Sequence, residues 1–178
     1  MKIIKTNLDG CVVIEPKVYG DERGFFLETF QVSRYAKDAG ITLPFVQDNY
    51  SRSSKGVLRG LHFQRTKPQG KLVRVVKGEV YDVAVDIRQG SPTYSKWAAI
   101  VLSENNKKQV WIPPGFAHGF LVLSEVADFE YKCTDYYDAD DECSIIWSDP
   151  SISISWPELN PILSKRDLSA PLLSEIFT

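Results

Sequence analysis

The sequence predicts an all-β protein, folded as a closed barrel or as a double-sheet jelly roll. Most of the chain consists of short segments rich in β-branched and aromatic residues, which are typical of strands. Turn clusters such as RQGSPTYS (88–95) and SENNKK (103–108) divide these segments. Helix signals are few. Many short, evenly spaced strands in one chain favour a barrel or a jelly roll.

In chain order, the first predicted strands are 11–16, 24–30, 44–51 and 56–64. Two more, 71–76 and 79–88, are separated by Lys77-Gly78, which suits a hairpin turn. The last five are 96–103, 108–113, 119–124, 127–133 and 143–147. The strand 79–88 alternates, so that one face carries Tyr81, Val83, Val85 and Ile87 and the other Asp82, Ala84 and Asp86.

Two places suggest short helices. Residues 33–41 offer Ser33 as an N-cap and Gly40 as a stop signal. The tail after Pro161 favours another short helix.

Length and composition indicate one globular domain over residues 1–178. The net charge of −2 argues against general nucleic-acid binding, which usually shows a basic excess. No apolar run approaches the roughly 20 residues of a membrane span, and the N-terminus has no signal-peptide core. Three cysteines without metal-type spacing suggest reduced thiols and a cytoplasmic protein.

Charge is distributed unevenly along the chain. Residues 49–78 contain eight basic residues and no acidic one, whereas residues 125–158 contain ten acidic residues and one basic one. The simpler interpretation is two solvated faces of opposite sign. The functional alternative is a local anion site for a phosphorylated small molecule.

The chain has two histidines, His62 in RGLHFQ (59–64) and His118 in PPGFAHGF (113–120). A histidine-rich metal site needs more ligands, and the position that would continue the alternation after His62 is Gln64. Metal binding is therefore the weaker hypothesis. Between Leu61 and Phe63, His62 is either a hydrogen-bonded core residue or a catalytic base, and the strand pattern alone leaves both open.

A catalytic base needs partners, and several residues could supply them. Tyr131 shares a strand face with Phe129 and Cys133, so it should point inward as a core residue or as a proton donor. Lys71 shares its face with two valines and is either a snorkelling surface group or a cation that polarises a carbonyl. Arg23 and Arg59 carry guanidinium groups suited to phosphates.

Arg59 and His62 would lie on opposite faces of a regular strand because their spacing is odd. Gly60 lies between them, and a strand glycine often marks a bulge that re-aims the next side chain. We therefore predict a break in the strand near Gly60 that lets both residues face one cavity.

Taken together, the segments GDERGFFLETF, RGLHFQ, QGKLVRVVKGEVYDVAVDIR, IPPGFAHGF, FEYKCTDYY and SKRDLSAPLL resemble the dTDP-4-dehydrorhamnose 3,5-epimerases of bacterial rhamnose biosynthesis. The resemblance follows nearly the whole chain in order. It implies a cupin-type jelly-roll fold, a reaction without metal or organic cofactor, and a homodimer that exchanges strands between protomers.

The same resemblance implies a role for individual residues. His62 matches the catalytic base and Asp167 its partner carboxylate, Tyr131 matches the acid on the opposite face of the sugar, and Lys71 matches the group near the keto oxygen. Matches to substrate-binding positions are Arg23, Glu28, Gln47, Asn49, Arg59, His118 and Glu142. Where the family commonly has a lysine before the aspartate, this chain has Arg166, which keeps the charge and the expected binding role.

The resemblance implies that the substrate is dTDP-4-dehydro-6-deoxy-glucose, whose C4 ketone acidifies the hydrogens on C3 and C5. The alternatives are an epimerase of one centre, a 3,4-ketoisomerase, a non-catalytic nucleotide-sugar-binding protein, and a metal-dependent cupin oxygenase. The resemblance favours inversion at both centres.

Overall fold

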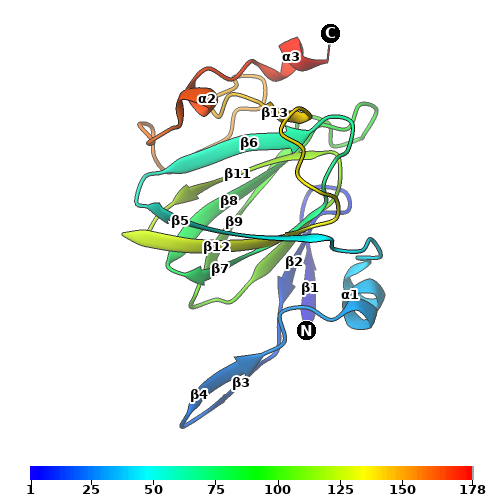
Figure 1. Cartoon of the computed structure of the whole chain (residues 1–178), viewed down its shortest axis with the longest axis vertical. Coiled ribbons are helices and arrows are strands. Elements are labelled where there is room, and N and C mark those ends of the chain that lie inside the picture. Colours follow the sequence, from blue (N-terminus) through cyan, green and yellow to red (C-terminus); the bar gives the residue numbers. More distant parts are fainter. Residues whose placement is uncertain (178) are drawn as a thin grey trace.

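Two antiparallel sheets packed face to face form the body of the protein, and a separate hairpin projects away from them (Figure 1). The computed structural model describes residues 1–177. The larger sheet has the strand order β1 (Lys2–Lys5), β2 (Val12–Glu15), β10 (Gln109–Ile112), β7 (Lys71–Lys77), β12 (Val126–Cys133) and β5 (Gln47–Ser54). The predicted all-β jelly roll is confirmed.

The smaller sheet has five strands, and its order places the two histidine-bearing strands side by side. They are β13 (Glu142–Ser144), β6 (Leu58–Gln64), β11 (Phe116–Val122), β8 (Glu79–Asp86) and β9 (Trp97–Ser103). The projecting hairpin consists of β3 (Val18–Asp21) and β4 (Gly24–Leu27). Strands β1 and β3 were absent from the sequence-based prediction.

Three short helices complete the fold: α1 (Val32–Ala39), α2 (Lys165–Leu168) and α3 (Leu173–Ile176). Gly40 ends α1 as predicted, in a left-handed conformation with φ of 71°. The prediction that Ser33 caps this helix is wrong. Gln31 is the N-cap, and its side chain accepts a hydrogen bond of 2.6 Å from the backbone N–H of Arg34. The helices are too short or too polar to cross a lipid bilayer.

The buried hydrophobic residues form three layers. The central layer lies between the sheets and joins Val73 and Val110 of one sheet to Val80 and Phe120 of the other. A second layer lies on the outer face of the five-stranded sheet, beneath the C-terminal segment. A third lies on the outer face of the six-stranded sheet, where α1 packs through Tyr35.

Strand β8 has the alternating side-chain pattern predicted for residues 79–88. Val83 and Val85 face the outer layer beneath the C-terminal segment, whereas Ala84 faces the layer between the sheets. The predicted alternation is confirmed, and it directs Asp82 and Asp86 into the interior, where both are fully buried. An ionised carboxylate at such a position needs hydrogen-bond partners.

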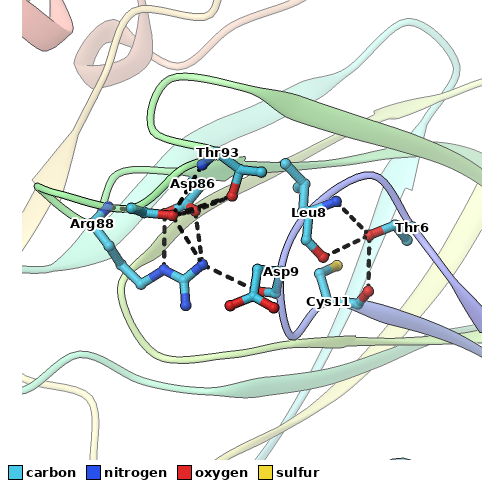
Figure 2. A network of polar contacts seen from close by, with 8 residues as sticks. Thr6, Leu8, Asp9, Cys11, Asp86, Arg88 and Thr93 are labelled. Carbon is cyan, nitrogen blue, oxygen red and sulfur yellow. Dashed lines mark hydrogen bonds and ion pairs between the residues drawn. The ribbon is translucent and has the colours of Figure 1, made fainter.

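Asp86 has its partners in a polar network at one end of β8 (Figure 2). Its carboxylate accepts hydrogen bonds from Arg88, Ser91 and Thr93 at 2.6 to 2.9 Å. Arg88 also donates to the backbone oxygen of Asp9 at 3.0 Å. Although burial opposes ionisation, the side-chain donors hold the pKa of Asp86 far below its usual range. This aspartate therefore has a structural function.

The basic and acidic stretches of the sequence lie opposite one another across β5, β12 and β7. Four ion pairs join them: Arg52–Asp128, Lys55–Glu125, Lys67–Asp138 and Arg74–Glu130. Half of the eight basic residues are thus neutralised by acidic neighbours. Arg59 and Lys71 form no ion pair within residues 1–177, which leaves these two cations available inside the fold.

The predicted break at Gly60 is confirmed. His62 pairs with His118, but Arg59 pairs with Phe120, so a step of three residues on β6 matches a step of two on β11. As a result Leu58 and Leu61 both pack in the outer hydrophobic layer although their spacing is odd. The extra residue turns Arg59 and His62 to the same side of the sheet.

Gly60→Ala is expected to lower the free energy of unfolding by about 2 kcal/mol or more, because strain and overpacking add. Gly60 has a φ of +130°, and a Cβ there would lie 2.5 Å from the Cα of Gly119. Gly56→Ala is the matched control, since Gly56 has a φ of +77° with open space around it. Urea unfolding would measure both, and equal losses would contradict the packing argument.

Candidate active site

A group of polar side chains from both sheets interrupts the apolar interior. His118 lies on β11 between Phe116 and Phe120, which belong to the central hydrophobic layer. From the other sheet, Tyr131 packs against the same layer. His62 and His118 are direct cross-strand partners, so their side chains point to the same side. The two histidines therefore face Tyr131 across the interior.

His62 is held by a carboxylate from the far end of the chain. Its Nε2 lies 2.6 Å from Oδ1 of Asp167, and the side chains are 28% and 4% exposed. Asp167 is in α2, whose N-cap Ser164 accepts a hydrogen bond from the Asp167 backbone N–H. If Nε2 carries the proton that Asp167 accepts, Nδ1 is free to act as a base.

Opposing influences act on the ionisation of Asp167. Burial is the largest and favours the protonated form, but hydrogen bonds from His62, Ser164 and the Gly60 backbone, with the charge of His62, outweigh it. The pKa of Asp167 is therefore lowered. The ionised carboxylate is the form suited to orienting an imidazole and to stabilising its protonated state.

A second histidine–aspartate pair lies beside the first. Nε2 of His118 is 2.8 Å from Oδ2 of Asp82, and the side chains are 8% and 0% exposed. The His118 ring stacks on Phe129, with ring centroids 6.0 Å apart, and Phe129 in turn contacts the ring of Tyr131 at 5.9 Å. The rings of His118, Phe129 and Tyr131 therefore contact one another in a row, which holds His118 in place.

Within residues 1–177, two buried side-chain oxygens have no hydrogen-bond partner, and each adjoins one of these histidines. They are Oδ1 of Asp82, which binds His118 through its other oxygen, and Oγ of Ser144, the cross-strand partner of His62. Unpaired buried polar atoms are uncommon in native proteins and often mark a functional site.

Tyr131 and Lys71 face the interior from the opposite sheet, on β12 and β7. Burial is the main cause that raises the pKa of Tyr131 to about 12, so the phenol stays protonated near neutral pH. Burial also lowers the pKa of Lys71, against the charges of Cys133, Glu142 and Asp82. A buried lysine and a protonated tyrosine are suited to stabilising and protonating an oxyanion or carbanion.

A cavity of about 300 Å³ opens beside the His62–Asp167 pair. Arg59, Arg166 and Ser164 also line it. Arg59 donates from Nε to Ser53 at 2.9 Å, which leaves its other guanidinium nitrogens without a hydrogen-bond partner in the described chain. An anionic group at this opening would therefore meet arginine next to the histidine.

Gln47 and Asn49 extend the wall formed by Tyr131. They are the cross-strand partners of Cys133 and Tyr131 and hydrogen-bond one another at 3.0 Å. Gln47 also accepts from the backbone N–H of Tyr137 at 2.8 Å. These amides thus lie on the inner side of edge strand β5, next to the proposed proton donor.

Arg166 is joined to Glu142 rather than left free. Its guanidinium hydrogen-bonds the Glu142 carboxylate and, at 2.9 Å, the Glu142 backbone oxygen. The Tyr137 hydroxyl donates to the same carboxylate at 2.8 Å. The three residues link β13 to α2, which carries Asp167. A lysine at position 166 would not offer the two-pronged contact of an arginine.

Two predicted binding residues lie away from this group. Arg23 is in the projecting hairpin, where it pairs with Asp21 and is 85% exposed. Glu28 follows the hairpin and pairs with Arg34 of α1 at 3.1 Å. The hairpin extends away from the end of the molecule that carries α2 (Figure 1). Within one chain the structure does not bring these two residues to His62.

Within the described residues, no three histidine, cysteine, aspartate or glutamate side chains are grouped as metal ligands. His62 and His118, although adjacent, each bind their own aspartate.

Comparison with known proteins places this arrangement in a family. The family model for dTDP-4-dehydrorhamnose 3,5-epimerase matches residues 5–175. The chain belongs to the dTDP-4-dehydrorhamnose 3,5-epimerase family. The enzyme of that name from Shigella flexneri is 55% identical over 170 residues, which cover 95% of this chain and 94% of the relative. The protein is therefore an isomerase of the epimerase class with a cupin-like fold.

Solved structures of the epimerase family agree closely with this chain. The dTDP-6-deoxy-D-glucose-3,5-epimerase of Legionella pneumophila, in complex with dTDP-4-keto-L-rhamnose, has a TM-score of 0.96 and 59% identity, covering 98% of this chain and 94% of that one. A 3'-monoepimerase of Streptomyces bikiniensis, in complex with dTDP-quinovose, has a TM-score of 0.88 and 32% identity, covering 95% and 86%. The fold is thus shared by epimerases of two centres and of one.

Sequence reasoning did not single out Asp82 and Ser144, which the structure places beside the two histidines. A signal for Asp82 was present, because the strand 79–88 carries aspartates at two positions of a face whose opposite side is apolar. If both faces of the strand are buried, those aspartates must be paired inside. Ser144 has no comparable signal, because its importance comes only from its register with His62.

Asp167→Asn is expected to lower the free energy of unfolding at pH 7 by about 1–3 kcal/mol, since it removes a buried, charge-assisted hydrogen bond. Because the pKa of Asp167 is lowered in the folded state, this stabilisation is present above the unfolded pKa of about 3.9. It is lost as the pH falls through the folded-state value. Urea unfolding between pH 7 and pH 3 would measure it, and a pH-independent difference between the two proteins would contradict the expectation.

Proposed function

We propose that this chain inverts C3 and C5 of dTDP-4-dehydro-6-deoxy-glucose to give dTDP-4-dehydro-rhamnose, with His62 as the base. The observation that carries the proposal is the 2.6 Å contact between His62 and Asp167 beside a cavity, with Tyr131 packed into the central layer from the opposite sheet. Every step uses acid–base groups of the chain. The free thiols of Cys11, Cys133 and Cys143 support a cytoplasmic location.

In the first step, neutral His62 removes the proton from a carbon next to the C4 ketone. The electron pair of the broken C–H bond moves into the ring, and the keto oxygen becomes an enolate oxygen. Asp167 stabilises the imidazolium that forms, since its carboxylate accepts a hydrogen bond from the other ring nitrogen. Tyr131 then donates its phenolic proton to the same carbon from the opposite side, while the enolate electrons form the new C–H bond and the C4 ketone returns, which inverts the centre. Before the second carbon reacts, His62 releases its proton to water and the Tyr131 phenolate takes up a proton from water.

Lys71 is the group proposed to stabilise the enolate. Its side chain points into the interior from the strand that adjoins Tyr131, and the described chain offers it no ion-pair partner. An unpaired ammonium in a desolvated site interacts strongly with developing negative charge. The remaining predicted residues would bind the nucleotide-sugar, with Arg59 and Arg166 toward the diphosphate and Gln47, Asn49, His118 and Glu142 toward its polar groups.

Inversion of a single centre is the second candidate. The similarity to a 3'-monoepimerase favours it, because that chain shares the fold at 32% identity. The two reactions use the same proton transfers and differ in whether the sugar ring is processed at one carbon or at both.

Incubation of the substrate with the enzyme in deuterated water is expected to place deuterium at both C3 and C5. His62→Ala should reduce the exchange about 10²–10⁴-fold, the usual contribution of a general base. Tyr131→Phe should slow inversion while leaving exchange from the His62 side detectable. Mass spectrometry and proton NMR of the product would measure both.

The other outcomes of this experiment separate the alternatives. Deuterium at one carbon alone would establish a single-centre epimerase. A product with its carbonyl at C3 would establish a ketoisomerase. Binding of the nucleotide-sugar without exchange would indicate a non-catalytic protein. Stoichiometric iron together with oxygen consumption would indicate an oxygenase.

We further propose that the active form is a homodimer that exchanges the β3–β4 hairpin. Large apolar side chains are exposed on this hairpin: Tyr19 by 55%, Phe25 by 62% and Phe26 by 69%. Such a patch on a projecting element is typical of an interface. Strand β5 is an open edge of the six-stranded sheet and bears Gln47 and Asn49. Docked along that edge, the hairpin of a partner would supply Arg23 and Glu28.

Mixing two inactive variants tests the shared site. His62→Ala and Arg23→Ala are each expected to be impaired alone. After mixing and reassembly, about a quarter of wild-type activity should return, because half of the randomly formed dimers are mixed and each has one intact site. Sedimentation would establish the oligomeric state. Mixtures no more active than their components would contradict the exchange.

A further inference from the structure

Asp82 is a buried acidic residue to which the proposed reaction assigns no role. It lies in the middle of β8, on the inner face, with 0% of its side chain exposed. Its neighbour on that face, Ala84, belongs to the central hydrophobic layer. A carboxylate surrounded by such residues destabilises the fold unless it is compensated by partners.

The first partner of Asp82 is His118, at 2.8 Å. His118 is the cross-strand neighbour of His62 and of Ala84, and its ring stacks on Phe129. The hydrogen bond to Asp82 and the stacking on Phe129 together fix the plane and the tautomer of the His118 ring. Asp82 therefore determines which ring nitrogen His118 presents to the interior.

The second oxygen of Asp82 is buried and has no hydrogen-bond partner in residues 1–177. Lys71 faces the same interior from β7, on the strand face that carries Val73 and Val75. The groups that act on Lys71 are Cys133 of β12, Glu142 of β13 and Asp82 of β8, and Asp82 favours its charged form. Asp82 is the smallest of these three influences. Glu142 already binds Arg166 and Tyr137, which leaves Asp82 as the fully buried carboxylate.

We propose that Asp82 is a positioning residue of the epimerase site, which orients His118 and contributes a buried negative charge to the interior that Lys71 faces. It does not contact the reacting carbons. One oxygen fixes the imidazole, and the other faces the interior without a partner. This inference rests on the proposed function, since it assumes that a charged Lys71 stabilises the enolate.

Asp86 provides a matched comparison on the same strand. It faces the same side as Asp82 and is equally buried, but its carboxylate is satisfied by Arg88, Ser91 and Thr93 (Figure 2). Neither histidine contacts it. If burial of a carboxylate in β8 were only a structural feature, Asp82→Asn and Asp86→Asn should have the same kind of effect.

The test measures kcat and KM against pH for the wild type, Asp82→Asn and Asp86→Asn. Asn has the shape of Asp without its charge. For Asp82→Asn we expect kcat to fall by about tenfold or more through loss of orientation. The alkaline limb of the kcat profile should move to lower pH, because Lys71 loses a nearby opposite charge. Asp86→Asn should lower the thermal stability, while its kcat profile against pH should match that of the wild type.

Asp82→Glu is the second variant, in case Asp82→Asn does not fold. It keeps the charge but displaces the carboxylate. We therefore expect kcat to fall, while the alkaline limb of the kcat profile stays at the wild-type pH. A wild-type profile and kcat in Asp82→Asn, or a wild-type kcat in Asp82→Glu, would overturn the inference. Deuterium exchange by the wild type is measured alongside. Its absence would refute the proposed function itself, whereas normal exchange with unaffected variants would refute only the role of Asp82.

Discussion

The close backbone approach of Gly60 and Gly119 sets the geometry on which the interior depends. A Cβ on Gly60 would lie 2.5 Å from Gly119, and one on Gly119 would lie 2.8 Å from the backbone oxygen of Arg59. Only strands without side chains at this crossing can pair so closely while β6 contains an extra residue. Because of that residue, β6 buries its leucines in the outer layer and still turns Arg59 and His62 inward. Without it, one of the two would face away.

The protein separates its charges into two groups with different energetics. On the outside, the basic residues of β5 and β7 pair with acidic residues of β12 at partly exposed positions, although the Asp128 carboxylate itself is only 6% exposed. Exposure to solvent weakens such pairs. Inside, His62, His118 and Lys71 share the interior with Asp167 and Asp82. Burial raises the cost of every charge there, but it also strengthens each interaction with a developing charge. Desolvation lowers the pKa of Lys71 and raises that of Tyr131, and the raised pKa keeps the phenol protonated for the proton donation proposed above.

The sequence predicted the parts of the fold that depend on local periodicity, and the resemblance supplied those that depend on long-range contacts. Alternation along 79–88 and the glycine in RGLHFQ were enough to predict the faces of β8 and the break in β6. Alternation could not tell which face of β8 lies between the sheets, since both are buried. The meeting of His62 with Asp167, 105 residues apart, has no local signal at all. Ser33 was wrong as a cap because the helix begins at Val32, which places Ser33 inside its first turn, and Gln31 accepts from the Arg34 backbone N–H.

Asp167 shows why the docking of the C-terminal tail matters to the chemistry. Helix α2 has four residues, too few to be stable alone, so its position depends on side-chain contacts. Ser164 caps its start, Arg166 binds both the carboxylate and the backbone oxygen of Glu142, and Asp167 itself binds His62. An ammonium at position 166 could keep the charge but not the planar, two-pronged contact. The arginine found here therefore ties α2 to β13 on one side while Asp167 ties it to β6 on the other. The orientation of His62, the proposed base, thus depends on β13 as well as on its own strand.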